Sequence, residues 1–332
     1  MKAAQLSEYG PAENFQIVDL PKPSPRAGEV LIEVAFAGLR WGDIMGRKGI
    51  PVRTQTGAFV PGMEAVGVVA ELGEGVSHLT VGDRVVAQPQ GGAYAAFLRA
   101  PVAAVGRVPD HVPLETMLVT RVNLPTAYML VYEWAKVQEG ETVLVHAAAG
   151  GVGMLVVQIL KRKFQNVTVI GLAGSDEKVA QVLANGADHA INYKTHDYVA
   201  EVGKIAGVKP AGFAPGAPPA GVHVALNGVG GATLKTDRRV IRRLGRWVLY
   251  GTPGGTEAVN PFEYSYDSIA ILPFSIIPYA GSPEMARAQA YVKDWLKTEP
   301  LTAPVIHPIE DIAKVQAAME RGETSGKVVF RL

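Results

Sequence analysis

The stretch Val143-Leu-Val-His-Ala-Ala-Ala-Gly-Gly-Val-Gly-Met-Leu-Val-Val-Gln158 decides the fold, because it reads as an apolar strand, a glycine-rich turn and an apolar helix without a break. Ala147, Gly150 and Gly153 have the spacing of a dinucleotide-binding fingerprint whose first glycine is replaced by alanine. Ala147 keeps the turn tight, Gly150 lets the backbone approach a pyrophosphate, and Gly153 lets the helix pack on the sheet. The alternative is a glycine-capped corner of an ordinary α/β protein.

The next strand, residues 167–172, is followed by a segment that bears on the choice of cofactor. An NAD-binding site places an acidic residue there to hold the ribose 2′-hydroxyl. This chain has Ala173-Gly174-Ser175 instead, so nothing repels a 2′-phosphate, and Ser175 and Lys178 can hold one. Tyr193, after the third strand, can lie over the adenine side. We therefore expect NADPH, with the alternative that Lys178 is an ordinary solvated lysine.

Length and charge exclude several classes of protein. With 332 residues the chain can build two domains, and a net charge of +1 from 32 basic and 31 acidic residues leaves no basic patch for nucleic acid or an anionic membrane. No charged and apolar leader begins at Met1, and no apolar run is long enough to span a bilayer. The expectation is a soluble cytoplasmic protein.

The chain contains no cysteine, which removes disulfides, thiolate nucleophiles and cysteine ligands for zinc. The seven histidines are scattered, and no pair of them has the spacing of metal ligands on a helix or hairpin. We expect no metal site.

The rhythm of the sequence changes along the chain. Residues 1–121 contain short β-like runs between glycines and prolines and predict a small barrel-like β domain. Residues 122–287 alternate strands with helices and predict a doubly wound parallel sheet. Residues 288–332 contain an amphipathic helix at 309–320 and a strand at 327–331 that needs a partner in the N-terminal domain. The Pro- and Gly-rich stretch 209–221 predicts an irregular surface loop. The parallel strands are expected at residues 142–146, 167–172, 189–192, 222–226 and 245–250.

Motifs spread over nearly the whole chain carry a resemblance to a known family. They include Ala37-Gly-Leu-Arg-Trp-Gly-Asp43, Pro61-Gly-Met-Glu-Ala-Val-Gly67, Gly91-Gly-Ala-Tyr94, Thr126-Ala-Tyr128, the fingerprint at 145–153, Asn185-Gly-Ala-Asp188, Gly228-Val-Gly-Gly231 and Thr324-Ser-Gly-Lys-Val-Val329. On these motifs the chain resembles the zinc-independent quinone oxidoreductase branch of the medium-chain dehydrogenase/reductase superfamily, which includes zeta-crystallin. Within that branch it is most similar to the synaptic vesicle amine transport protein homologues.

The resemblance implies an α/β fold with a GroES-like catalytic domain formed by both chain ends and a Rossmann domain between them. It implies that NADPH delivers hydride to a quinone or an α,β-unsaturated carbonyl compound without a metal, and that a homodimer forms through an edge strand at residues 269–276. Two alternatives stay open. One is an enoyl reductase that tailors a specific metabolite such as a polyketide intermediate, and the other is a nucleotide-binding interaction protein with vestigial redox activity.

Arg40, Asp43 and Tyr128 are the candidate catalytic residues. Arg40 stands where the family usually has asparagine, and its guanidinium can polarise a carbonyl or bind an anionic substrate. The alternative is that Arg40 points to solvent or forms an ion pair with Asp43 or Glu64. Asp43 can orient this loop, and Tyr128 can supply a proton or simply fill space. Apolar residues at Trp41 and 274–279 suit a hydrophobic or aromatic substrate.

The expected cofactor contacts follow from the fingerprint and from the resemblance. At the end of the fourth Rossmann strand, Asn227 replaces the family's aspartate and is expected near the nicotinamide ribose. The full set of candidates is Thr126, Ala148, Gly150, Gly151, Val152, Gly153, Gly174, Ser175, Lys178, Tyr193, Asn227, Gly251 and Lys327.

Overall fold

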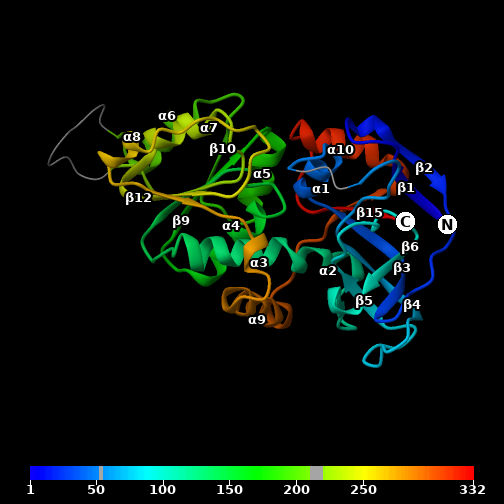
Figure 1. Ribbon diagram of the computed structural model, residues 1–332. Helices are drawn as coiled ribbons and strands as arrows, with labels where there is room; N and C mark the ends of the chain where they lie inside the picture. The colour runs from blue at the N-terminus through cyan, green and yellow to red at the C-terminus, as the bar shows by residue number, and fades with distance from the viewer. Residues whose placement is uncertain (52–54, 210–219) are drawn as a thin grey trace. The chain divides into compact units, whose positions relative to one another are not determined.

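The computed structural model describes residues 1–51, 55–209 and 220–332, which form two compact units. Unit 1 consists of Met1–Arg121 and Leu296–Leu332, and unit 2 consists of Val122–Trp295. The blue N-terminal strands and the red C-terminal elements of Figure 1 belong to the same unit. The second boundary falls inside helix α9 (Pro283–Thr298), whereas the sequence suggested a return segment from residue 288. Most of the expected loop at 209–221 lies outside the described residues.

Unit 2 is built on a parallel sheet with the order β10-β9-β8-β11-β12-β13 among the described residues. The chain runs from β8 to β9 and β10 on one side and then returns to β11 on the other side, so the strand order reverses between β8 and β11. Ligands of doubly wound sheets bind outside the carboxyl ends of the strands at this point. The predicted Rossmann fold is confirmed. The strands are β8 (Thr142–Val145), β9 (Thr168–Ala173), β10 (His189–Asn192), β11 (Val222–Asn227), β12 (Ile241–Leu249) and β13 (Ala270–Pro273).

Helices connect these strands, as the alternating sequence pattern predicts. The first helix of unit 2 ends at Tyr128 and continues as a π-helix at Met129–Trp134. The helices are α3 (Asn123–Tyr128), α4 (Gly153–Lys163), α5 (Asp176–Ala184), α6 (Tyr198–Ala206), α7 (Thr233–Thr236) and α8 (Phe262–Ser265). No helix in the described ranges combines the length and the apolar character needed to cross a membrane.

Unit 1 is a mostly antiparallel sheet that joins the two chain ends. Its strands follow the order β14-β15-β3-β4-β5-β7 in the described residues, and β6 pairs with β3. Strand β15 pairs antiparallel with β3, so the predicted C-terminal strand has its partner in the N-terminal segment. The elements are β1 (Lys2–Leu6), β2 (Phe15–Asp19), β3 (Glu29–Leu39), α1 (Trp41–Arg47), β4 (Ala65–Leu72), β5 (Arg84–Ala87), β6 (Phe97–Pro101), β7 (Val105–Arg107), α2 (Leu114–Arg121), β14 (Val305–Pro308), α10 (Ile312–Glu320) and β15 (Val328–Arg331).

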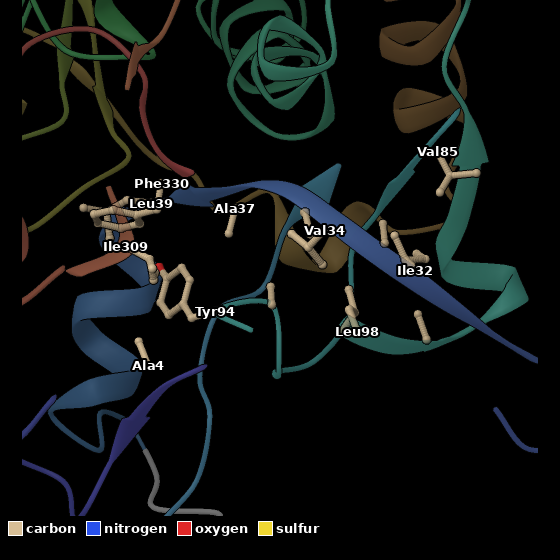
Figure 2. Packing of buried hydrophobic residues seen from close by; sticks show 14 of the residues in the cluster. Ala4, Ile32, Val34, Ala37, Leu39, Val85, Tyr94, Leu98, Ile309 and Phe330 are labelled. Carbon is tan, nitrogen blue, oxygen red and sulfur yellow. The ribbon is translucent and has the colours of Figure 1, made fainter. Parts of the chain in front are cut away.

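The core of unit 1 explains why both chain ends are needed. Figure 2 shows Ile32, Val34, Ala37 and Leu39 along β3. A register irregularity between Val34 and Phe36 shifts the alternation by one residue, so even-numbered and then odd-numbered side chains enter the core. Phe330 from β15 packs edge-on against Tyr94 at 5.7 Å between ring centroids. The return segment therefore closes the hydrophobic core.

Candidate functional site

The turn between β8 and α4 has the close packing of a dinucleotide fingerprint. Ala147 has a positive φ of 49°, and its carbonyl oxygen accepts the Gly150 amide at 2.8 Å. The Ala148 amide donates to the Leu172 carbonyl at 3.0 Å and ties the turn to β9. A side chain on Gly153 would place its Cβ 2.8 Å from the Ala148 Cα, so only glycine lets α4 begin this close to the turn.

The carboxyl ends of β9 and β10 bring together the residues expected at the 2′-phosphate. The Ser175 hydroxyl accepts the Lys178 amide at 3.3 Å and caps α5. The half-exposed Tyr193 places its hydroxyl against Gly174. The nearest carboxylate along the chain, Asp176, accepts a hydrogen bond from Asn192 Nδ2 at 2.7 Å. Nine predicted cofactor residues lie in the turn between β8 and α4 or just after β9 and β10. They are Ala148, Gly150, Gly151, Val152, Gly153, Gly174, Ser175, Lys178 and Tyr193.

A buried carboxylate lies behind the carboxyl ends of β8 and β11. Asp237 Oδ1 accepts hydrogen bonds from His146 Nε2 at 2.9 Å and from the Tyr198 hydroxyl at 2.8 Å. Its Oδ2 accepts from Asn227 Nδ2 at 2.7 Å and from Trp247 Nε1 at 2.8 Å. Burial raises the pKa of Asp237, but His146 and the donated hydrogen bonds outweigh it and hold the pKa below its usual value. Asp237 is therefore an ionised carboxylate.

Asn227 supports the glycine turn that follows β11. Its Oδ1 accepts the amides of Val229 and Gly230, both at 2.9 Å. Its Nδ2 donates to Asp237 and also to the Thr233 hydroxyl at 2.8 Å. Both N–H groups and the carbonyl oxygen are thus engaged within unit 2 and support the turn, and the expected place of Asn227 near the nicotinamide ribose stays a prediction.

Gly251 and Thr126, two further predicted cofactor residues, also lie in unit 2. Gly251 follows β12 and packs on the glycine turn, because an added Cβ would lie 2.5 Å from the Gly228 carbonyl oxygen. Thr126 is buried in α3. Its backbone amide donates to the Val122 carbonyl at 2.9 Å, as in a regular helix.

Unit 1 contains a cluster of four charged side chains around the end of β3. Arg40 Nε lies 3.7 Å from Asp43 Oδ2 and 4.0 Å from Glu64 Oε2. The Arg40 amide donates to Asp43 Oδ2 at 2.8 Å, and the buried Lys327 ammonium forms an ion pair with Glu64. Arg121 adds a third positive group, because its charge also interacts with Glu64. The structure thus shows the ion pair that was the alternative interpretation of Arg40, with both Asp43 and Glu64 as partners, and a catalytic role for Arg40 stays a prediction.

Burial controls the ionisation of this cluster. Desolvation, with Glu64 close by, raises the pKa of Asp43 above its usual value, although Arg40 opposes the shift. Desolvation also raises the pKa of Tyr94 well above its usual range, and the Tyr94 hydroxyl donates to the Gly38 carbonyl at 3.3 Å. Burial lowers the pKa of Arg40, but the two carboxylates outweigh it and leave a net rise, so the guanidinium stays charged.

Lys327 and Tyr128 have contacts that differ from their expected roles. Lys327 forms an ion pair with Glu64 and donates to the Leu39 carbonyl at 3.3 Å, and its expected contact with the cofactor stays a prediction. Tyr128 donates to Glu133 Oε1 at 3.4 Å, and its ring packs at 5.0 Å from Tyr132. Burial and then Glu133 raise the pKa of Tyr128. These contacts favour the space-filling role of Tyr128.

The aromatic residues expected to line the substrate site lie in both units. Trp41 begins α1 of unit 1. Phe274 and Tyr279 stack on each other at 6.0 Å, and both pack edge-on against Trp134 in unit 2. They form an aromatic cluster of unit 2.

The sequence did not point to Asp237 or His146. His146 is a single polar residue at the end of an apolar strand, which was a faint signal of a buried partner. Asp237 lies 91 positions further along the chain in a stretch of mixed charges, so no local pattern connects the two. Among the described residues, no group of three or more His, Cys, Asp or Glu side chains is arranged to hold a metal ion.

Comparisons with known proteins match both parts of the chain. An alcohol dehydrogenase GroES-like domain model matches residues 26–110, and a zinc-binding dehydrogenase model matches residues 151–288. A synaptic vesicle membrane protein VAT-1 homolog from Rattus norvegicus is 34% identical over 253 residues, which cover 76% of this chain and 59% of the rat protein. The chain thus spans under two thirds of that relative.

Two further proteins match more of their own length. A probable quinone oxidoreductase from Schizosaccharomyces pombe is 35% identical over 263 residues, which cover 78% of this chain and 74% of the yeast protein. The structure of Escherichia coli quinone oxidoreductase complexed with NADPH superposes with a TM-score of 0.87 and 25% identity over 100% of both chains. On these matches, the chain belongs to the medium-chain dehydrogenase/reductase superfamily, close to the quinone oxidoreductases and the VAT-1 homologues.

Proposed function

We propose that this protein is an NADPH-dependent oxidoreductase that reduces quinones or α,β-unsaturated carbonyl compounds. The observation that carries the proposal is the dinucleotide turn at the strand-order reversal, followed by Ser175 and Lys178 in place of an acidic residue. The match to a quinone oxidoreductase complexed with NADPH supports the same cofactor. NADPH supplies a hydride when it is bound.

The residues of unit 2 fit such a cofactor. The turn at Ala148–Gly153 would let the backbone approach a pyrophosphate at Gly150, which carries no side chain, while Gly153 lets α4 begin close to the turn. Ser175, Lys178 and Tyr193 are the groups that would hold the 2′-phosphate and the adenine. Asp176 does not compete for this position because it is bonded to Asn192.

We propose that Arg40 is the group that stabilises the developing enolate. Its Nε faces Asp43 and Glu64, while its two terminal nitrogens make no hydrogen bond to any described residue. These nitrogens are free to donate to a carbonyl oxygen, where negative charge develops during the reaction. Lys327, Arg40 and Arg121 together exceed the two carboxylates by one positive charge, which favours negative charge that develops on a substrate oxygen.

Asp43 has a supporting role in this proposal. Its Oδ2 accepts the Arg40 amide and lies near the Arg40 Nε, so it orients the side chain that precedes α1. It is a positioning residue rather than a proton donor, because a buried carboxylate close to the substrate oxygen would repel the enolate when ionised.

Two measurements test the proposal. NADPH should bind at least roughly tenfold more tightly than NADH, as expected for a phosphate held by a lysine, and Lys178→Ala should reduce this preference. NADPH should then be oxidised steadily with a panel of neutral quinones and enones. Equal affinity for both cofactors would remove the NADPH assignment. Tight NADPH binding without turnover on any acceptor would instead favour the nucleotide-binding interaction protein.

We also propose that two chains associate through β13. This strand lies at the end of the sheet and has no partner on its outer side in the described part of the chain, so a second copy can extend the sheet. The cytoplasmic location expected from the sequence stays a prediction.

A further inference from the structure

Asp237 links the two strands between which the sheet order reverses. His146 directly follows β8 and Asn227 is the last residue of β11, and both donate to the carboxylate of Asp237. The side chains of Asp237 and Asn227 are fully buried and that of His146 almost so. The link therefore lies behind the crevice where a dinucleotide binds to this type of sheet.

The carboxylate has no capacity left for proton transfer. Four donors, from His146, Tyr198, Asn227 and Trp247, fill the sites that two carboxylate oxygens offer. A buried charge is costly unless it is paired and hydrogen-bonded, and here every interaction serves to hold a neighbouring group in place. Asp237 thus acts through its neighbours.

Asn227 connects Asp237 to the backbone of the following turn. Because Asp237 only accepts hydrogen bonds, the amide group of Asn227 must turn its Nδ2 towards it. The Oδ1 of Asn227 then faces the amides of Val229 and Gly230. An Asn227 amide flipped by 180° would lose all of these bonds. The charge on Asp237 therefore determines the conformation of the turn at Gly228–Gly231.

The position of this turn indicates which part of the cofactor it serves. The fingerprint after β8 receives the pyrophosphate, and Ser175 and Tyr193 after β9 receive the adenosine half. The carboxyl ends of β11 and β12 lie on the other side of β8, so the turn after β11 faces the nicotinamide half. The loop after β12 packs on the same turn, since the Gly254 amide donates to the Val229 carbonyl at 2.8 Å.

We propose that Asp237 is a positioning residue that orders the Gly228–Gly231 turn, through Asn227, for the nicotinamide half of NADPH. The inference rests on the proposed cofactor and adds a residue that contacts neither NADPH nor substrate. It makes a claim that a purely structural role does not make: loss of the charge affects one half of the cofactor and spares the other.

The test compares two ligands on the purified full chain. NADPH reports on the whole site, whereas adenosine 2′,5′-bisphosphate reports only on the adenosine half. Asp237→Asn should weaken NADPH binding on the order of tenfold or more, because the N–H of the new amide faces one of the four groups that donate to Asp237. The affinity for the bisphosphate should stay within about twofold of the parent value. Titration by protein fluorescence or calorimetry measures both constants without turnover.

A reciprocal exchange sharpens the test. Asn227→Asp alone places two carboxylates face to face and should also weaken NADPH binding. The double variant N227D/D237N restores one carboxylate and one amide donor between these positions, while Trp247 Nε1 loses its acceptor, so it should recover part of the affinity lost in either single variant. Tyr198→Phe is the matched control, because it removes one donor from Asp237 and leaves the Asn227 contact intact.

Each outcome decides the proposal. Selective loss of NADPH affinity with recovery in the double variant supports it. An unchanged NADPH affinity in Asp237→Asn, or equal weakening of both ligands, overturns it. If Asp237→Asn does not fold, the same two ligands are titrated against Asn227→Ser. This variant removes the link between Asp237 and the turn and leaves three donors on Asp237. Failure of the parent chain to bind either ligand would refute the proposed cofactor instead.

Discussion

At the residue scale, Arg40 has an Nε that is ion-paired but makes no hydrogen bond, and terminal nitrogens that we propose donate to the substrate. Asp43 and Glu64 lie within 4.0 Å of its Nε, and one fifth of the side chain is exposed. A preoriented donor of this kind loses little entropy when it meets a developing oxyanion. The asparagine that the family usually carries here is a shorter, neutral donor, so Arg40→Asn removes the charge and withdraws the donor.

Replacing Arg40 by asparagine should lower kcat and kcat/KM by roughly 10- to 1000-fold on neutral quinones and leave the NADPH affinity nearly unchanged. Steady-state kinetics and a cofactor titration measure the two effects. Arg321→Asn is the control, because Arg321 is an exposed arginine of the same unit that pairs with Glu323. Parent-like rates in Arg40→Asn would leave Arg40 with a structural role only.

The raised pKa of Asp43 predicts a specific pH dependence of stability. Because this carboxyl binds its proton more tightly in the folded chain than in the unfolded chain, ionisation costs stability as the pH rises through the range above its ordinary value. Asp43→Asn lacks this cost. The unfolding free energy of the parent minus that of Asp43→Asn should therefore be smaller at pH 7 than near pH 4.

Denaturant unfolding at both pH values measures this difference. A difference that does not change, or that grows between pH 4 and pH 7, would show that Asp43 is not held in an environment that opposes its charge.

At the element scale, the start of α4 depends on how closely the helix approaches the preceding turn. The atoms that crowd Gly153 belong to the backbone of Ala147 and Ala148, and a backbone cannot rotate away as a flexible side chain can. Ala147 already has a positive φ, so the turn has little freedom to adjust. The geometry of this one junction positions the whole N-terminal end of the helix.

Gly153→Ala should destabilise unit 2 by about 1–3 kcal/mol and weaken NADPH binding, because α4 must shift away from the turn. Thermal unfolding and cofactor titration measure the two effects. Gly46→Ala in α1 is the matched control, since nothing lies within 4 Å of its added Cβ and alanine favours the helix. Equal behaviour of the two variants would contradict the argument from close packing.

At the scale of the whole molecule, unit 1 is assembled from both ends of the chain, and the sheet of unit 2 has β13 as an edge strand among the described residues. Strand β15 lies between β14 and β3, so the C-terminal segment is part of the central sheet of unit 1. In unit 2, β13 offers unpaired backbone groups on its outer side within the described residues. An edge of this kind is suited to pairing with a second chain.

Analytical ultracentrifugation should therefore give the mass of two chains. Leu272→Lys places a charge on the edge strand and should shift the equilibrium towards the monomer. Val208→Lys is the control, because Val208 is exposed and follows α6 rather than β13. A monomeric parent, or a dimer that Leu272→Lys leaves unchanged, would contradict association through β13.

Much of the fold could be predicted because its signals are local. The strand at His189–Asn192 and the strand–turn–helix unit at the fingerprint follow from residues close together in sequence, where periodicity and glycine spacing decide the structure. The cofactor choice follows from residues 173–178 for the same reason. The break of the helix into a π-helix at Met129 has no such signal, because all its residues are good helix formers or neutral.

The two-domain fold, the dinucleotide turn and the absence of cysteine ligands follow from the amino-acid sequence alone, since each depends on residue types and short spacings. Only the tertiary structure decided which charges meet. Lys327 pairs with Glu64 across 263 positions, and Asp237 meets His146 across 91. Burial then makes these pairings necessary, because a charge removed from water is costly unless a partner with the opposite charge or a hydrogen-bonding group lies beside it.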